Sequence, residues 1–457
     1  MLVLKFGGTS LESAEAIQRA GEIIRARLDR HPVVVVSAMG KTTNRLLAVA
    51  QAAVEGRRKE AIQGIHDLRD FHSREARRLA PLSDRAEIDL FLDEHFQELT
   101  ELVKGLSVLG EATPRSIDAI SSYGERLSSH IVCRALRHFG LDAVHLDARS
   151  VIVTDARFNQ AAPLYDLTYA RLAQAVPPLA SAGKVVVMGG FIAATQDGVT
   201  TTLGRGGSDF SASLIGAGIA AEEIQIWTDV DGMLTCDPAI LPGGRRVKVI
   251  SFNEAAELAY FGAKVLHPST LLPAMDRNIP VRILNSRRPA CEGTQIVSQA
   301  PPASSLAKSI ACKNNITVLD ISSTRMLMAH GFLHRIFEVF DRYQTPVDMV
   351  ATSEVSVSLT IDSTARLADI TRDLAQFAEV RHENRQAIIC LVGDNIRYTP
   401  GVAARIFQAV RHVNVRMISQ GASLRNVSFV VHQDDLRAAV EALHAALFSD
   451  LDPEIFE

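Results

Sequence analysis

Short apolar runs that end in glycine turns recur through the first two thirds of this chain. Residues 1–6 are followed by Gly7 and Gly8, a four-valine run within 31–40 ends at Gly40, and the run within 183–193 contains a glycine pair. Unbroken apolar runs of this length are typical of parallel strands that are buried on both faces. The pattern predicts an α/β fold, with a parallel-rich sheet sandwiched by helices.

The segments between these runs complete that pattern. Further strands are predicted within 141–148, 222–234 and 279–285, and residues 45–140 read as mostly helical. We also expect a helix over 11–28, with Ser10 and Glu12 forming its N-terminal cap and first turn. Ligands of parallel sheets bind beyond the carboxyl ends of the strands. The glycine turns therefore mark the expected site.

Charge and cysteine content narrow the classes of partner. The 457 residues are 47% hydrophobic, and 48 basic against 52 acidic residues leave a net charge of -4. We therefore expect small-molecule partners, and neither nucleic acid nor a membrane. The five cysteines lack metal-ligand spacing, so we expect reduced thiols and no metal site. The sequence opens without a charged leader, which favours a cytoplasmic protein.

The last third of the chain contains an internal repeat. It follows a linker-like segment at 298–305, and residues 331–337 (GFLHRIF) recur as 401–407 (GVAARIF), each followed by two short strands. This order predicts two ferredoxin-like βαββαβ units. The second copy lacks a final strand, and we infer that residues 306–313 supply it. The first unit would then be inserted within the second.

Two glycine-containing turns carry charged side chains. Lys5 lies beside Gly7, Gly8 and Ser10, a combination that can wrap phosphates and neutralise their charge, although such a turn is also common as a purely structural feature. It is not a Walker A loop, which argues against a P-loop NTPase. The loop at 204–209 precedes an apolar helix, so it is either an anion-binding helix start or a capped structural turn.

Other candidate residues are polar side chains that follow predicted strands or, for Glu125, lie in the mostly helical segment. Ser37, Thr43 and Glu125, together with Arg205 in the 204–209 loop, supply the donors, acceptor and guanidinium that suit a small zwitterion with an ammonium and carboxylates. Thr228 and Asp229 follow another strand, where they would face a nucleotide or its magnesium. Lys264 supplies a second cation for phosphates.

The motifs together resemble one family. The sequence is similar to the aspartokinases, of the amino-acid kinase family, at residues 5–10 (KFGGTS), 37–44 (SAMGKTTN), 204–209 (GRGGSD), 227–232 (WTDVDG) and 261–268 (FGAKVLHP). Residues 306–457 resemble the paired, nested ACT domains of the monofunctional, lysine-sensitive members. The resemblance implies a catalytic domain over 1–297, a first ACT domain over 314–386, and a second ACT domain built from 303–313 and 387–457.

The resemblance implies MgATP-dependent phosphorylation of the side-chain carboxylate of L-aspartate to 4-phospho-L-aspartate, the first step toward lysine, threonine and methionine. Its catalytic residues would be Lys5, Asp209 and Lys264. Its aspartate-binding residues would be Ser37, Thr43, Glu125, Arg205, Gly206, Gly207 and Ser208. Its ATP-binding residues would be Gly7, Gly8, Ser10, Thr228, Asp229, Leu234, Lys264 and Val265. Leu234 and Ala239 depart from the family pattern, which has an aromatic and a basic residue there.

The resemblance also implies feedback inhibition by L-lysine, bound between ACT domains of two subunits in a homodimer, with a tetramer as the alternative assembly. Asp348 would be the partner of the ligand ammonium. Ala329 and Pro346 stand where this group often has serine, which removes two hydrogen-bonding groups. The implied effector residues are Met326, Gly331, Phe332, Leu333, Val347, Asp348, Thr352, Ser353 and Glu354.

Two alternatives stay open from the sequence. The glycine turns and lysines would serve another kinase of this family, acting on glutamate, N-acetylglutamate or a nucleotide, but the helical segment over 45–140 and the ACT pair weigh against it. The other alternative is an amino-acid sensor without catalytic activity. The joint presence of Lys5, Asp209 and Lys264 argues against it.

Overall fold

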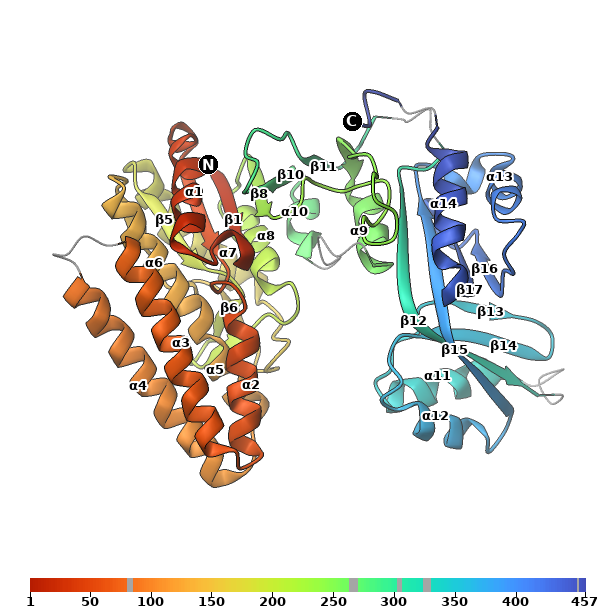
Figure 1. The fold of residues 1–457 in the computed structure, drawn as a ribbon, viewed down its shortest axis with the longest axis horizontal. Coiled ribbons are helices and arrows are strands. Elements are labelled where there is room, and N and C mark those ends of the chain that lie inside the picture. The colour runs from red at the N-terminus through yellow and green to blue at the C-terminus, as the bar shows by residue number, and fades with distance from the viewer. Residues whose placement is uncertain (80–84, 263–269, 302–305, 324–329, 450–451) are drawn as a thin grey trace. The chain divides into compact units, whose positions relative to one another are not determined.

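The structure is a computed structural model, and it describes residues 1–79, 85–262, 270–301, 306–323, 330–449 and 452–457. The chain divides into two compact units (Figure 1). Unit 1 comprises Met1–Met233 and Val265–Gln299, and unit 2 comprises Leu234–Lys264 and Ala300–Glu457. None of the helices in the described ranges is long and apolar enough to cross a membrane.

The core of unit 1 is a sheet whose strands are mostly parallel. Within unit 1 its order is β3-β5-β2-β1-β8-β10-β11, and among these strands only β11 runs antiparallel to its neighbour. The strands are β1 (Leu2–Phe6), β2 (Pro32–Val36), β3 (Ala143–His145), β5 (Val185–Gly189), β8 (Glu223–Thr228), β10 (Val281–Asn285) and β11 (Thr294–Val297). Every residue of β1, β2 and β5 is buried, as expected for strands covered on both faces.

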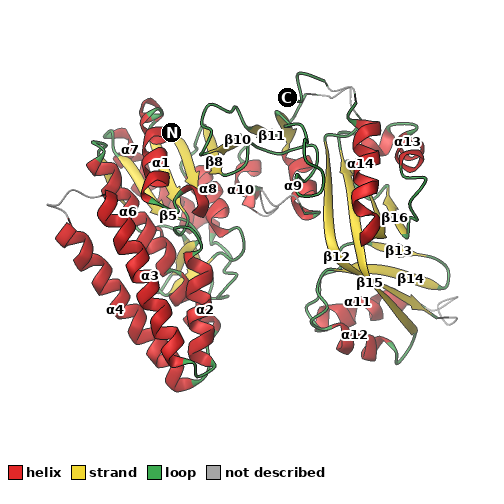
Figure 2. Cartoon of the chain, in the orientation of Figure 1, coloured by secondary structure: helices red, strands yellow, loops and turns green. Residues whose placement is uncertain are grey.

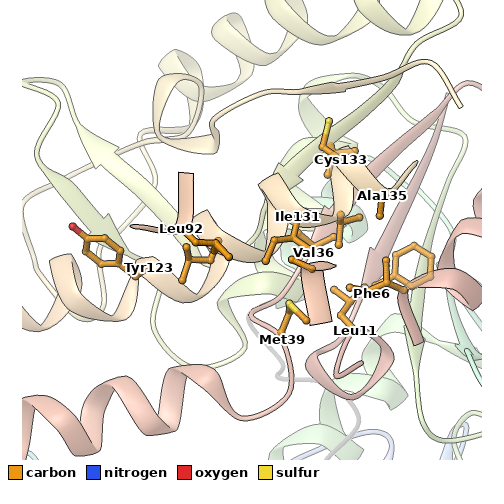
Figure 3. Packing of buried hydrophobic residues seen from close by; sticks show 14 of the residues in the cluster. Phe6, Leu11, Val36, Met39, Leu92, Tyr123, Ile131, Cys133 and Ala135 are labelled. Atoms are coloured by element: carbon orange, nitrogen blue, oxygen red, sulfur yellow. The ribbon is translucent and has the colours of Figure 1, made fainter. Parts of the chain in front are cut away.

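Helices pack on both faces of this sheet, which Figure 2 shows as strands between helices. On one face, alternate residues such as Phe6 and Val36 join a core with Leu11, Met39 and Ile131 (Figure 3). The helices on this side are α1 (Ala14–Arg25), α2 (Thr42–Val54), α3 (Arg58–Leu79), α4 (Arg85–Leu109), α5 (Pro114–Ser121) and α6 (Tyr123–His138). The other face is covered by α7 (Tyr165–Ser181) and α8 (Gly207–Gly218), and α10 (Leu272–Asp276) packs against α8.

A small second sheet lies in the same unit, in the order β4 (Val153–Thr154), β6 (Ile192–Thr195), β7 (Thr200–Thr202).

The expected first helix is shorter than predicted, and its cap is different. Ser13, not Ser10, accepts the hydrogen bond from the Ala16 amide at the start of α1. Ser10 cannot cap this helix because it lies in a 3-10 turn and its hydroxyl bonds to Trp227 and Ser286.

Unit 2 contains one antiparallel sheet of order β13-β14-β12-β15-β17-β16. The two central strands each have 14 residues, and Ser309–Lys313 at the start of β12 pairs with the end of β15. The strands are β12 (Ser309–Ser322), β13 (Val350–Thr352), β14 (Ser356–Ile361), β15 (Glu379–Val392), β16 (Met417–Gln420) and β17 (Asn426–His432). Its other elements are β9 (Val249–Ser251), α9 (Phe252–Tyr260), α11 (Phe332–Arg342), α12 (Leu367–Leu374), α13 (Val402–Ala409) and α14 (Leu436–Leu447).

The structure agrees with the predicted fold class: a parallel-rich α/β sheet is followed by an antiparallel sheet. The two repeat copies form α11 and α13, and each begins at a glycine with positive φ, Gly331 (79°) and Gly401 (81°). The domain bounds inferred from the sequence stay a prediction.

Candidate active site

The parallel strands of unit 1 end in one row. Phe6 is in register with Val36 on one side and with Trp227 on the other, and Val36 is in register with Gly189. Backbone hydrogen bonds then join the loops that follow, because the Ser37 amide donates to Phe6 at 3.0 Å and the Gly190 amide donates to Val36 at 2.8 Å. The glycine turns therefore meet at the carboxyl edge of the sheet, as predicted.

Glycine is required at this edge because the loops approach one another closely. A Cβ at Gly8 would lie 2.7 Å from the Gly40 carbonyl oxygen, and a Cβ at Gly190 would lie 2.8 Å from the Ser208 Cα. Gly206 caps α8 with φ of 73°, a conformation that other residues adopt at a cost. The turns can therefore enclose a ligand between backbone groups.

A cavity of about 420 Å³ opens between these loops. Nine of the ten residues predicted for catalysis and aspartate binding line it. The lining residues are Lys5, Gly8, Ser37, Ala38, Gly40, Lys41, Thr43, Asn44, Glu125, Phe191, Gly204, Arg205, Gly206, Gly207, Ser208 and Asp209.

Every described residue predicted for catalysis or aspartate binding therefore lines one cavity, and Lys264 lies outside the described residues.

An ion pair lies among the side chains that line this cavity. Lys5, on β1, places its Nζ 2.5 Å from Oδ1 of Asp209, in the first turn of α8. The Lys5 side chain is 9% exposed and that of Asp209 is 14% exposed. The carboxylate therefore holds the ammonium at the carboxyl end of the central strand, beside the N-terminus of α8, where the helix dipole favours an anion.

Glu125 forms a second, separate polar group in the cavity. It lies in the first turn of α6, and its Oε1 accepts the Ala38 amide at 3.1 Å. Its Oε2 is buried and has no hydrogen-bond partner among the described residues. Burial raises the pKa of Glu125 to about 8, while the bond from Ala38 and the charge of Lys5 act in the opposite direction. A cationic ligand would relieve this buried carboxyl group.

Arg205 provides the complementary charge. It lies between two glycines with positive φ, Gly204 and Gly206, and its side chain is exposed at the cavity wall. No hydrogen bond or ion pair within the described ranges holds the guanidinium, so it is available for a ligand carboxylate. Ser37, Thr43 and Ser208 add hydroxyl groups to the same wall.

The residues predicted to bind ATP are distributed differently. Gly8 lines the cavity, whereas the Gly7 amide donates to Trp227 at 3.0 Å and Ser10 is 2% exposed. These two residues therefore hold the turn after β1 against the end of β8. Thr228 donates to the exposed Asp229 at 3.2 Å, at the end of β8.

The remaining nucleotide positions lie elsewhere in the chain. Leu234 belongs to unit 2, where its carbonyl accepts a hydrogen bond from Ser309 at 2.7 Å. Ala239 is exposed, and its amide donates to Asp237 at 2.8 Å. Val265 lies outside the described residues, like Lys264.

The predicted effector residues lie in unit 2. Asp348, with a side chain only 4% exposed, forms an ion pair with Lys313 of β12 at 2.6 Å, and Lys313 also contacts Asp362 at 2.9 Å. Burial raises the pKa of Asp348, and the Lys313 ammonium opposes that shift. Lys313 was not predicted from the sequence, because nothing local to it indicates its partner 35 residues away.

The other effector positions are near the ends of α11 and β13. Phe332 is buried at the start of α11, Val347 is half-buried, and Leu333 is exposed. Thr352 ends β13, and Ser353 bonds to Ser356 at 2.7 Å in the turn that contains the exposed Glu354. Met326 and Ala329 lie outside the described residues.

The cavity also contains residues that the sequence did not single out. Lys41 and Asn44 belong to the polar turn after β2, and Phe191 follows the glycine pair after β5 with φ of 63°. Position after a strand was the available signal for all three. It applies equally to many loop residues, so it does not select them without the tertiary structure.

Known proteins resemble this chain over nearly its whole length. The profile of the amino acid kinase family matches residues 1–285, and an ACT domain profile matches residues 389–447. Aspartokinase 2, chloroplastic, of Arabidopsis thaliana is 39% identical over 470 residues, which cover 99% of this chain and 85% of that protein. Lysine-sensitive aspartokinase 3 of Escherichia coli (strain K12) is 35% identical over 463 residues, which cover 98% and 99%.

Two solved structures match this chain in the same way as these related sequences. The crystal structure of E. coli aspartokinase III in complex with aspartate and ADP (R-state) matches with a TM-score of 0.86 and 34% identity, covering 98% of this chain and all of that one. Its complex with lysine and aspartate (T-state) matches with a TM-score of 0.82 at the same identity and coverage. With the strand-end cavity and the ACT-type sheet, these matches show that the chain belongs to the aspartokinases of the amino acid kinase family.

Proposed function

We propose that this kinase transfers the γ-phosphoryl group of ATP to the side-chain carboxylate of L-aspartate. The observation that carries the proposal is that one cavity combines two sets of charged side chains. The Lys5–Asp209 ion pair suits phosphoryl transfer, and Glu125 with Arg205 suits the binding of an amino acid. The solved relative named above was crystallised with aspartate and ADP, which supports the same pair of ligands.

The chemical step needs little from the protein beyond position and charge. A side-chain carboxylate oxygen of aspartate attacks the γ-phosphorus, a new P–O bond forms, and the bond from the γ-phosphorus to the bridging oxygen breaks as ADP leaves. The attacking carboxylate is already ionised, so no general base is required. Lys5 neutralises charge on the transferring group, and Asp209 holds the Lys5 ammonium in place.

Lys264 would supply a second cation for the phosphates, in keeping with the family motif at residues 261–268. Mg²⁺ neutralises charge on the β- and γ-phosphate oxygens when it accompanies the nucleotide. The exposed carboxylate of Asp229 and its neighbour Thr228 are oxygen donors of the kind that this ion prefers. We place the nucleotide on this side of the cavity, against Gly8.

The amino-acid end is defined by opposite charges. Glu125 would accept the substrate ammonium through its free Oε2, and Arg205 would bind a carboxylate with two hydrogen bonds. Ser37, Thr43 and Ser208 would complete the contacts. N-acetylglutamate lacks the ammonium that Glu125 would bind, and glutamate is longer by one methylene group, so both fit this arrangement less well.

Hydroxylamine traps an acyl phosphate as a hydroxamate, which gives a direct test. We expect hydroxamate formation to require ATP, Mg²⁺ and L-aspartate together, and to fall by at least about a hundredfold in Lys5→Met. Glu75→Ala, in a buried carboxylate of α3 outside the cavity, is the matched control. Equal turnover of glutamate would contradict the substrate assignment, and nucleotide binding without turnover would favour the sensor.

We also propose that L-lysine inhibits the enzyme by binding at Asp348. We further propose that the active form is a homodimer made through the ACT domains, with a tetramer as the alternative assembly. The lysine-sensitive E. coli relative supports the effector, and its lysine complex supports a site of this class. In this chain the side chain of Asp348 is buried and pairs with the ammonium of Lys313, so this carboxylate already binds a group of the kind that the effector carries. Sedimentation velocity with and without lysine measures the assembly.

A further inference from the structure

Asp118 is a buried carboxylate that lies outside the cavity. It is on α5, its exposed fraction is 0%, and it is not among the residues that line the substrate site. No charged partner contacts it in the part of the chain that the structure describes. Burying a carboxylate costs free energy unless hydrogen bonds compensate the loss of water. The hydrogen bonds of Asp118 therefore show which segments of the chain it anchors.

Those bonds reach two segments: the end of β7, just before Arg205, and the loop that contains Asn159. The Thr202 amide donates to Oδ2 at 3.0 Å, and the Thr202 hydroxyl donates to Oδ1 at 2.6 Å. The Asn159 amide donates to both oxygens, at 3.1 and 3.0 Å. Asp118 therefore ties α5 to the end of β7 and to the loop beside it.

The tie extends into the glycine loop. The Ala161 amide donates to the Thr202 carbonyl at 3.0 Å, and Gly204 lies so close to Asn159 that a Cβ would be 3.1 Å from the Asn159 carbonyl oxygen. Gly204 also has φ of 74°, and Arg205 follows it directly. The position of the Arg205 backbone is thus set by segments that Asp118 holds.

The helix that carries Asp118 also leads to Glu125, the other charged residue proposed to bind the amino acid. The Ser122 amide donates to the Asp118 carbonyl at 3.0 Å at the junction of α5 and α6, and Glu125 lies in the first turn of α6. Asp118 therefore connects the two elements that present Glu125 and Arg205. Those two side chains would bind the ammonium and a carboxylate of one small molecule, so their separation must be held closely.

We propose that Asp118 is a positioning residue for the amino-acid substrate, which sets the separation of Arg205 from Glu125 without touching the ligand. This inference rests on the proposed function for its substrate and on the hydrogen bonds above for its mechanism. Loss of the anchor affects binding of the amino acid. It leaves the nucleotide side and the Lys5–Asp209 ion pair in place, because neither contacts Asp118.

The test compares three variants of the full chain by steady-state kinetics. We expect Asp118→Ala to raise KM for aspartate about tenfold, with kcat and KM for ATP changed less than about threefold. Asp118→Asn restores most of the affinity, because its oxygen still accepts the two backbone N–H groups and its amide donates to the Thr202 hydroxyl. Glu75→Ala, another buried carboxylate, leaves KM for aspartate unchanged.

Hydrogen–deuterium exchange tests the anchor without turnover. We expect faster exchange of amides at 202–208 in Asp118→Ala, and not in Glu75→Ala. Unchanged exchange there, or an unchanged KM for aspartate in a folded Asp118→Ala protein, overturns the inference. A wild type that does not phosphorylate aspartate overturns the proposed function and the substrate part of this inference, while the exchange result still decides the anchoring.

Discussion

At the scale of single residues, the cavity is an arrangement of charges with unequal burial. Lys5 and Asp209 neutralise each other, Arg205 is exposed, and Glu125 is buried with one oxygen bonded to Ala38 and the other free of described partners. Burial disfavours the charged carboxylate, which is why the pKa of Glu125 is raised to about 8. Burial therefore favours a protonated Glu125 at neutral pH, and an ammonium ligand would favour the ionised form.

This difference predicts a pH dependence. KM for aspartate should fall as pH rises through about 8, because more of the free enzyme then carries the charge that binds the ammonium. Glu125→Gln should show a higher KM that lacks this change. Steady-state kinetics at fixed ATP and ionic strength measure it. A parallel KM profile in the variant would show that the titrating group is elsewhere.

The same shift has a definite sign for stability. The folded state retains the Glu125 proton above the model-peptide value of 4.5, so it binds more protons than the unfolded chain between that pH and about 8. The contribution of this group to the free energy of unfolding is therefore fully present below pH 4.5 and is lost as pH rises through about 8. In Glu125→Gln that contribution is absent.

At the scale of elements, glycines determine how the strand ends meet the helices. Gly190 follows β5 and faces Ser208 at the start of α8, and the pair is close enough that no side chain fits between them. Gly8 and Gly40 make a similar contact between the turns after β1 and β2. Because these contacts are backbone to backbone, they cannot be relieved by a change of rotamer.

Gly190→Ala tests this arrangement. A Cβ there would lie 2.8 Å from both Cα and Cβ of Ser208, so α8 must shift, and with it Arg205 and Asp209. We expect about a tenfold loss in kcat/KM for aspartate, with destabilisation of about 1–3 kcal/mol. Gly105→Ala on α4 is the control, since a Cβ there meets nothing within 4 Å. Equal activity of the two variants would contradict the close contact.

At the scale of the whole molecule, the chain has two units with separate cores. The substrate cavity is lined by residues of unit 1, and the described effector residues belong to unit 2. A protein of this kind need not unfold in one step. A ligand stabilises the unit that binds it, by about 2.7 kcal/mol when its concentration is a hundred times its Kd.

Asp348→Ala separates the two ligands. We expect L-lysine to raise the thermal transition of the wild type and to inhibit it, and we expect both effects to weaken by about tenfold to a hundredfold in apparent affinity in Asp348→Ala. Activity without lysine, and stabilisation by aspartate with ADP, should be unchanged. Asp362→Ala, which also removes a partner of Lys313, should keep lysine sensitivity. Inhibition that survives in Asp348→Ala would locate the effector elsewhere.

The fold class and most cavity residues were predictable because their signals are local. Valine runs, glycine turns and the charged residues beside those turns occupy neighbouring positions in the sequence, and the parallel sheet then brings the strand ends together. Lys5 and Arg205 follow from that rule. Ser10 was assigned to a helix cap by the same local reasoning. That prediction was wrong, because the Ser10 hydroxyl bonds to Ser286 instead.

The sequence by itself determined the α/β alternation, the glycine-lined edge and the candidate residues at it. Only the tertiary structure decided which side chains pair: Asp118 with Asn159 and Thr202, and Lys313 with Asp348. These partners are 41, 84 and 35 residues apart. No periodicity links positions at such separations. They meet because packing of the sheet and helices fixes where each backbone segment lies, and buried polar groups then require a partner within reach.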